Sequence, residues 1–185
     1  PELNLDVIVN SSVFILPLGD NLFKVGATYN WVDKNCTPTE AGKNELISKL
    51  KEICANSSLP LVLLGGKEDA ATAEQVYQFH KNKTLNLCGK LNLNQSASII
   101  QQANKVITSD TGLMHIAAAF KKDIISLWGN TIPEFGMGPY LAGKNSQILE
   151  VKNLSCRPCS KLGYKKCPKG HFKCMNDIDI KTAQF

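Results

Sequence analysis

Residues 106–119 have the sequence VITSDTGLMHIAAA, in which an apolar run passes through a short polar turn into an alanine-rich run. The pattern predicts a buried strand that ends at Thr108, a turn around Asp110 and a helix that begins at about Gly112. A helix that starts directly after a strand presents unpaired N–H groups and a partial positive charge at its N-terminus. In open α/β sheets ligands bind at the carboxyl ends of the strands, and a helix N-terminus at that position favours a phosphate group.

The same alternation of strand and helix extends to both sides of this stretch. Residues 59–64 form a continuous apolar run that ends in Gly65 and Gly66, as expected of a strand covered on both faces of a parallel sheet. The other expected elements are helices over residues 71–80, 96–103 and 112–120 and strands over residues 85–88, 105–108 and 123–128. We therefore predict an α/β protein with a Rossmann-like, doubly wound parallel sheet.

The chain divides into three segments, because the pattern changes near residue 55 and again near residue 151. Residues 1–55 form a strand-rich α+β lead segment, with an antiparallel meander over 7–9, 13–18 and 22–27 and then a helix that begins at about Pro38. Residues 56–150 form the α/β domain. Residues 151–185 form a cysteine-rich tail with little periodicity, which we expect to be held by something other than a large core.

Composition narrows the class of protein. The 185 residues are 43% hydrophobic and 20% charged, which excludes a fibrous or wholly disordered chain. No apolar run reaches the ~18 residues of a membrane-spanning helix, and no signal-peptide pattern opens the chain. Seven cysteines are too few for a small secreted disulfide scaffold, so we expect a reducing cytoplasm. Because the chain begins with Pro1 rather than methionine, we expect a fragment or a trimmed protein.

The turn after the central strand carries the candidate ligand-binding residues. Thr111 supplies a hydroxyl, Gly112 lets a phosphate approach the backbone, and His115 lies about one turn into the helix. The alternative interpretation is purely structural. In that case Asp110 caps the helix and His115 packs in the core.

Four cysteines form a second candidate site in the tail. Cys156 and Cys159 are two residues apart, and Cys167 and Cys174 could complete a four-thiolate site for one tetrahedral ion, with His171 as a competing ligand. A structural zinc ion, four reduced thiols and two disulfides remain open as alternatives. A catalytic role is not expected, because no base accompanies the thiols.

The net charge of +5 is concentrated in the same tail, at Lys152, Arg157, Lys161, Lys165, Lys166, Lys169 and Lys173. Such a cluster can bind nucleic acid, acidic lipid or a phosphorylated ligand. We expect instead a solvated rim around the cysteines.

Residues 109–119 resemble the donor-site motif of glycosyltransferase family 9, the bacterial heptosyltransferases of lipopolysaccharide core assembly. Further matches follow in the order of that family: residues 61–69 resemble its strand and glycine turn, residues 88–91 with 99–103 its next strand and helix, and residues 128–133 its Gly-x-Thr-x-Pro loop. The resemblance covers residues 59–178, about two-thirds of the chain.

This resemblance implies a function and a set of partners. The family has a two-domain GT-B architecture, so residues 56–150 would be most of the nucleotide-sugar donor domain, and an N-terminal acceptor domain would be missing. The implied reaction transfers a heptose-type sugar from an ADP-sugar donor to a lipopolysaccharide core acceptor, with no metal required. The implied location is the cytoplasm, with peripheral contact at the inner face of the inner membrane, and no nucleic acid is expected as a partner.

The resemblance also implies roles for individual residues, although it assigns no catalytic residue. Thr111 and Gly112 would hold the diphosphate, Asp110 would lie near the sugar, and His115 would support the loop or the diphosphate. Either Glu68 or Asp69, after Gly65 and Gly66, would bind the ribose hydroxyls, and the sugar or base would be bordered by Gly129, Asn130 and Thr131.

Two other classes of protein stay open. Residues 1–54 resemble a segment of FAD-dependent amino-acid oxidases of the glycine oxidase type, through residues 14–19, 23–29 and 38–40. The dinucleotide fingerprint of that family is absent, so no flavin site can be argued. The third class is a zinc-knuckle module that binds nucleic acid through the basic tail.

Overall fold

The computed structural model describes residues 8–9, 14–16, 61–79, 81–161, 163–164 and 167–183. In this part of the chain seven strands form one sheet in the order β4-β3-β2-β5-β6-β7, and β1 pairs with β2. The strands are β1 (Ile8–Val9), β2 (Phe14–Leu16), β3 (Leu61–Leu64), β4 (Thr84–Asn86), β5 (Lys105–Ser109), β6 (Asp123–Trp128) and β7 (Gln147–Glu150). The helices are α2 (Ala70–Phe79), α3 (Leu93–Gln102), α4 (Gly112–Ala119) and α5 (Lys173–Asn176), with short 3-10 turns η1 (Lys67–Asp69), η2 (Lys81–Lys83), η3 (Pro133–Phe135) and η4 (Ile180–Thr182).

The predicted parallel α/β sheet is confirmed, with one exception in direction. β3 and β4 are parallel, and so are β5, β6 and β7. β2 lies between β3 and β5 and is antiparallel to both, with Phe14 opposite Leu64 and Ile15 opposite Ile107. Because β3 and β5 both oppose β2, they run in the same direction. The carboxyl ends of β3, β4, β5, β6 and β7 therefore lie at one edge of the sheet.

The reversed direction of β2 follows from its link to β1. Only four residues join the two strands, and a parallel pair needs a connection of about a dozen residues or more. The two strands are accordingly antiparallel, with Ile8 opposite Leu16, which agrees with the first half of the predicted meander. The predicted strand over 22–27 and the helix from about Pro38 lie outside the described residues.

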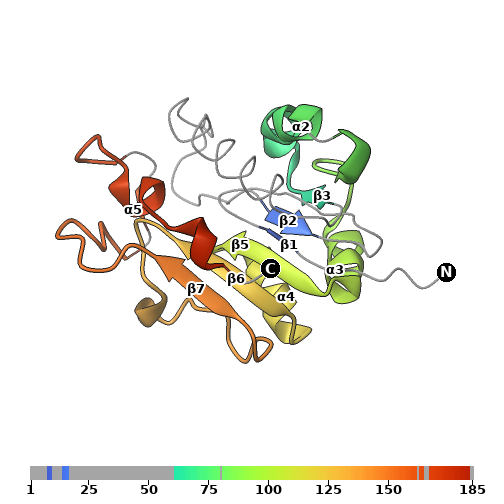
Figure 1. Ribbon diagram of the computed structural model, residues 1–185. Helices are drawn as coiled ribbons and strands as arrows, with labels where there is room; N and C mark the ends of the chain where they lie inside the picture. The colour runs from blue at the N-terminus through green and yellow to red at the C-terminus, as the bar shows by residue number, and fades with distance from the viewer. Residues whose placement is uncertain are drawn as a thin grey trace.

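Helices and the C-terminal segment cover both faces of the sheet (Figure 1). On one face α3 and α4 pack against the strands through a buried cluster that includes Val62, Ile100, Met114, Ala117 and Trp128. On the other face α2 and the C-terminal segment form a second cluster, which includes Leu63, Val76, Leu127, Leu149 and Ile178. Since both faces are covered, β3, β5 and β6 are buried almost throughout, as their apolar sequences predict.

The expectation that the tail lies apart from a large core is wrong. Ile178, Ile180 and Ala183 are buried in the same cluster as Leu127 and Leu149. The C-terminal segment crosses the near face of the sheet in Figure 1. Three apolar residues in an aperiodic stretch carry no helix or strand signal, so only the folded chain shows that they belong to the core.

One helix begins earlier than predicted, and one strand is additional to those predicted. α3 begins at Leu93 rather than at Ser96, because Asn92 and Gln95 form a capping box, with the Gln95 N–H donating to Asn92 Oδ1 at 2.9 Å. β7 was not predicted. It is a short strand of four residues, of which only Leu149 is buried, so its apolar pattern is weak.

No helix among the described residues is long and apolar enough to span a membrane.

Candidate functional site at the carboxyl edge of the sheet

Three of the predicted site segments follow strands that end at the carboxyl edge. Residues 65–69 follow β3, residues 110–115 follow β5, and residues 129–131 follow β6. β5 and β6 pair directly, from Lys105 opposite Asp123 to Ser109 opposite Leu127, so the second and third segments leave the sheet side by side. β2 stands between β5 and the strand that carries the first segment. The fold thus brings the candidate residues to the edge where α/β sheets bind ligands.

The N-terminus of α4 is capped by Thr111. Its hydroxyl accepts a hydrogen bond from the Met114 N–H at 3.4 Å, and its Oγ1 also lies 3.3 Å from Thr108 Oγ1. Thr111 is buried. The alternative in which Asp110 caps this helix is therefore wrong, because the neighbouring residue holds that position.

Space is open in front of the first turn of α4. A Cβ atom added to Gly112 would meet no atom within 4 Å apart from its chain neighbours and the backbone of its own helix. The residue is exposed, and its backbone conformation needs no positive φ. A negatively charged ligand can therefore approach the first N–H groups of the helix, where the helix dipole favours it.

Asp110 and His115 lie beside this opening. Burial raises the pKa of the Asp110 carboxyl above its ordinary value, and the charge of His115 opposes that shift. His115 is exposed, so the alternative in which it packs in the core is wrong. A partly desolvated carboxylate next to an exposed imidazole is an arrangement more common at functional sites than on ordinary surface.

The two carboxylates after β3 have different environments. Asp69 is buried, and its Oδ2 accepts a hydrogen bond from the Gly66 N–H at 2.7 Å, which closes the turn at η1. Glu68 is exposed, and its carboxyl group lies over Gly66, where a Cβ atom would clash with it. The Gly65 carbonyl accepts the Gly89 N–H at 2.9 Å, which joins this turn to the end of β4. The structure therefore gives Asp69 a structural contact and leaves Glu68 at the surface.

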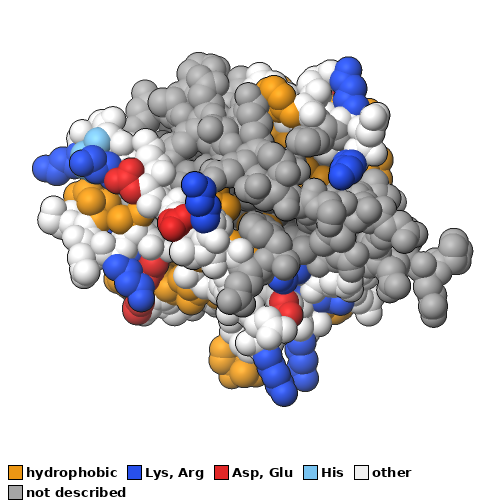
Figure 2. All heavy atoms as spheres, viewed as in Figure 1, with side chains coloured by type: hydrophobic (Ala, Val, Ile, Leu, Met, Phe, Trp, Pro, Cys, Tyr) orange, Lys and Arg blue, Asp and Glu red, His pale blue; other side chains and the backbone are white. Residues whose placement is uncertain are grey.

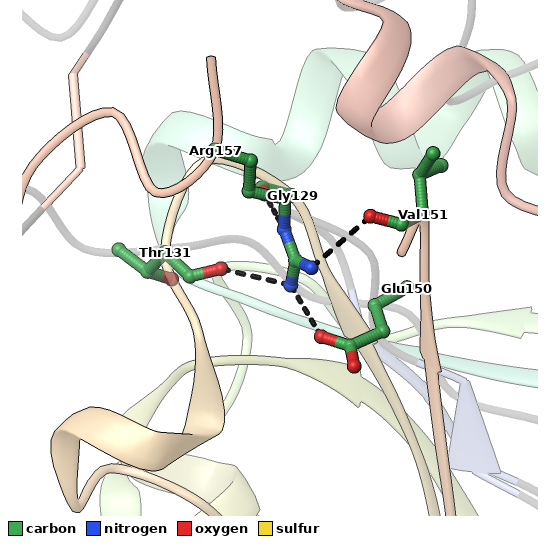
Figure 3. Close-up of polar contacts among 5 residues, drawn as sticks. All are labelled: Gly129, Thr131, Glu150, Val151 and Arg157. Atoms are coloured by element: carbon green, nitrogen blue, oxygen red, sulfur yellow. Dashed lines mark hydrogen bonds and ion pairs between the residues drawn. The ribbon is translucent and has the colours of Figure 1, made fainter. Parts of the chain in front are cut away.

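The segment after β6 is held by the tail. The Asn130 carbonyl accepts the Cys159 N–H at 2.8 Å, and Asn130 Nδ2 donates to the Tyr164 carbonyl at 2.7 Å. The Arg157 guanidinium donates to the carbonyls of Gly129 and Thr131 (Figure 3). The Asn130 amide, expected to border the sugar or base, is thus directed toward the tail.

The role of Arg157 at this edge was not predicted from the sequence. We grouped it with the tail lysines as part of a solvated rim, whereas its side chain is only 6% exposed. The sequence offered one sign that Arg157 differs from the tail lysines: Arg157 is the single arginine among 21 cationic residues. The described tail lysines Lys152, Lys161, Lys169 and Lys173 are exposed as expected, and Figure 2 shows cationic side chains spread in small groups over the visible face.

The tail cysteines lie near one another but hold no pattern of metal ligands. Cys156 Sγ lies 3.7 Å from His171 Nε2, and Cys159 Sγ donates to the Cys156 carbonyl at 3.3 Å. A hydrogen bond from the Phe172 N–H lowers the pKa of Cys167, whereas burial, reinforced by the neighbouring thiols, raises the pKa of Cys174 to about 11. None of the four forms a disulfide bond. Within the described residues no group of three or more His, Cys, Asp or Glu side chains is arranged to hold a metal ion, so the zinc site stays a prediction.

An open α/β sheet with these segments at its carboxyl edge belongs to the Rossmann-like class of α/β protein. The sequence model described as "Glycosyltransferase family 9 (heptosyltransferase)" matches residues 44–169. The chain belongs to glycosyltransferase family 9. The matched region begins earlier than the resemblance described above and takes in part of the lead segment.

Individual relatives agree with this assignment. Lipooligosaccharide heptosyltransferase 2 of Haemophilus influenzae is 35% identical over 142 residues, which cover 74% of this chain and 39% of that protein. The enzyme of the same name from Campylobacter jejuni is 29% identical over 121 residues, covering 64% and 36%. The crystal structure of the glycosyl transferase family 9 from Veillonella parvula shares the fold, with a TM-score of 0.56 and 21% identity over 83% of this chain and 41% of that one.

The chain spans about two-fifths of the length of these relatives. The resemblance of residues 1–54 to an oxidase segment receives no support from these matches. Most of those residues also lie outside the described part of the structure.

The carboxyl group of Asp110 sets a pH dependence of stability. Because its pKa is raised on folding, the folded chain holds the proton more tightly, and stability falls as the pH rises from the unfolded-state pKa of about 3.9 through the raised value. Asp110→Asn removes this penalty, so its melting temperature should rise relative to the unsubstituted chain as the pH goes from 4 to 7. Asp177→Asn, at an exposed aspartate, is the control. A difference that does not change with pH would contradict the prediction.

Asp69 and Glu68 should differ in their effect on stability. Asp69→Ala removes a charge-assisted hydrogen bond to Gly66, so urea denaturation should show a free energy of unfolding lower by about 1.5–3 kcal/mol. Glu68→Ala, at the neighbouring exposed position, should change it by less than about 0.5 kcal/mol. Equal losses in the two variants would show that both carboxylates are structural.

The zinc prediction can be tested by metal analysis. A chain purified without chelator should hold about one zinc ion, and Cys174→Ser should lose it. Cys88→Ser is the matched control, because Cys88 is a buried cysteine outside the tail. A metal-free chain whose four tail thiols all react with a thiol reagent would leave reduced cysteines as the answer.

Proposed function

We propose that this protein is a heptosyltransferase that transfers a heptose-type sugar from an ADP-sugar donor to a lipopolysaccharide core acceptor, and that the chain supplies its donor-binding domain. Membership of glycosyltransferase family 9 supports the reaction class. Similarity to proteins named lipooligosaccharide heptosyltransferase 2 supports the choice of substrates. The observation that carries the proposal is the open N-terminus of α4 at Gly112, directly after β5.

The reaction is a displacement at the anomeric carbon of the donor sugar. An acceptor hydroxyl forms the new glycosidic bond, the bond from the sugar to the diphosphate breaks, and the hydroxyl proton leaves to a base that we do not assign. ADP leaves with negative charge on its phosphate oxygens. The N–H groups and the dipole of α4 are placed to stabilise that charge as it develops, and we assign this part of catalysis to them.

The remaining roles follow from burial and contacts. Gly112 leaves room for a phosphate to reach the backbone, and exposed His115 is about one turn further along α4, where it supports the diphosphate. Glu68 is our choice for the ribose hydroxyls, because the Asp69 carboxylate already accepts the Gly66 N–H. Asp110, which is half-buried and directly precedes the capping residue Thr111, is our choice for the residue near the sugar.

The partners and the location belong to the same proposal. An acceptor domain, N-terminal to this chain in the full protein, would bind the lipopolysaccharide core and complete the cleft. The cytoplasm, with peripheral contact at the inner face of the inner membrane, is the location at which that acceptor would be available. The short span of this chain relative to its relatives is consistent with a missing domain.

Calorimetric titration with ADP tests the proposed donor site. The unsubstituted chain should bind ADP, and Gly112→Trp should weaken binding by at least about tenfold, because the indole would fill the space that the phosphate needs. The substitution should leave the fold intact, since its Cβ meets no atom within 4 Å.

Gln101→Trp is the matched control, because it adds the same side chain at an exposed position on α3. It should bind ADP like the unsubstituted chain. Absence of ADP binding in all three proteins, or equal affinity in all three, would contradict the proposed donor site.

A further inference from the structure

Arg157, in the tail, contacts the loop that follows β6 and the end of the neighbouring strand β7 (Figure 3). Its Nε donates to the Gly129 carbonyl at 2.6 Å, and its Nη2 to the Thr131 carbonyl at 3.0 Å. Its Nη1 donates to the Val151 carbonyl at 3.2 Å, and Nη2 also pairs with Glu150 Oε2 at 2.6 Å. A planar guanidinium with a fixed fork of donors can satisfy these four acceptors at once, whereas the single ammonium of lysine cannot.

The ion pair is largely removed from water. The Arg157 and Glu150 side chains are 6% and 13% exposed. A buried cation is tolerated only when it is paired and hydrogen-bonded, and both conditions are met here. The buried ion pair therefore fixes the Arg157 guanidinium in place, and with it the loop of residues 129–131 that it bonds.

These contacts determine the directions in which the backbone carbonyl groups of residues 129–131 point. The carbonyls of Gly129 and Thr131 accept from Arg157, and the carbonyl between them, that of Asn130, accepts the Cys159 N–H at 2.8 Å. Three successive carbonyls are thus bonded to the tail. The peptide bonds of this loop are trans, and in a trans peptide the C=O of one residue and the N–H of the next point to opposite sides. Each N–H of residues 130–132 accordingly points away from the tail group that bonds the carbonyl of its own peptide, so the Asn130 and Ile132 N–H groups point away from Arg157.

This orientation matters because the loop leaves β6 directly beside the segment that leads from β5 into α4. Carbonyl oxygens at this edge would repel a diphosphate, whereas N–H groups would attract it. The tail holds the carbonyls, and among the described residues no backbone carbonyl accepts from the N–H groups of residues 130–132, so these donors can face an anionic ligand at the edge.

We propose that Arg157, held by Glu150, is a positioning residue for the nucleotide-sugar donor, which turns the carbonyls of residues 129–131 away from the donor and its N–H groups toward it. This inference rests on the proposed function and extends it to a residue in the tail. Arg157 does not itself touch the donor. It acts through the backbone of the loop.

The test combines ADP affinity with amide signals from nuclear magnetic resonance. In the unsubstituted chain, ADP should shift the amide signals of Asn130, Thr131 and Ile132. Arg157→Lys keeps the charge but loses the fork of donors, so the loop is no longer held in place and ADP binding should weaken by about tenfold. The three amide shifts should also shrink or disappear. A role limited to overall stability would not remove them selectively.

Lys152→Met is the matched control, because it removes one positive charge from an exposed position of the same tail. It should leave both ADP affinity and the three amide shifts unchanged. The inference is overturned if the unsubstituted chain binds ADP without shifting these amides, or if Arg157→Lys binds ADP as well as that chain. If Arg157→Lys does not fold, Glu150→Gln, which removes the partner that holds Arg157, should show the same loss of ADP affinity and of the three amide shifts, and unchanged binding would overturn the inference. Failure of that chain to bind ADP would instead overturn the proposed function, and this inference with it.

Discussion

The parallel pairing of β5, β6 and β7 is the constraint on which the rest of the structure depends. Five residue pairs align β5 with β6, and four align β6 with β7. Because the strands run in the same direction, the turns after Ser109, Trp128 and Glu150 all leave the sheet at the same edge. Helix α4, the loop after β6 and the start of the tail are therefore neighbours, although about 20 residues separate each from the next.

Burial divides the polar residues at this edge into two groups. Thr111 and Asp69 are buried, and both bond to nearby backbone N–H groups, as buried polar groups in proteins must. Glu68, Gly112 and His115 are exposed. The first group shapes the turns, and the second group is available to a ligand. Asp110 lies between these extremes, half-buried and with a raised pKa.

Much of the fold could be predicted because its signals are local. The apolar runs of β3, β5 and β6 and the start of α4 at Gly112 follow from residues close together in the sequence, and they are confirmed within one or two residues. β7 was missed because only one of its four residues is buried. The start of α3 was placed too late because its cap, Asn92, precedes an exposed leucine rather than an apolar stripe.

The sequence alone determined that a buried strand turns directly into a helix at Gly112, because the apolar strand, the polar turn and the glycine at the helix start are consecutive residues. Only the tertiary structure distinguished Glu68 from Asp69, which are chemically alike and adjacent, because one is exposed and the other is buried and bonded to the Gly66 N–H. It also revealed the position of Arg157, whose acceptors at Gly129 and Thr131 lie 28 and 26 residues away along the chain. Hydrogen bonds over such separations depend on where the strands pair, and no local pattern of residues records them.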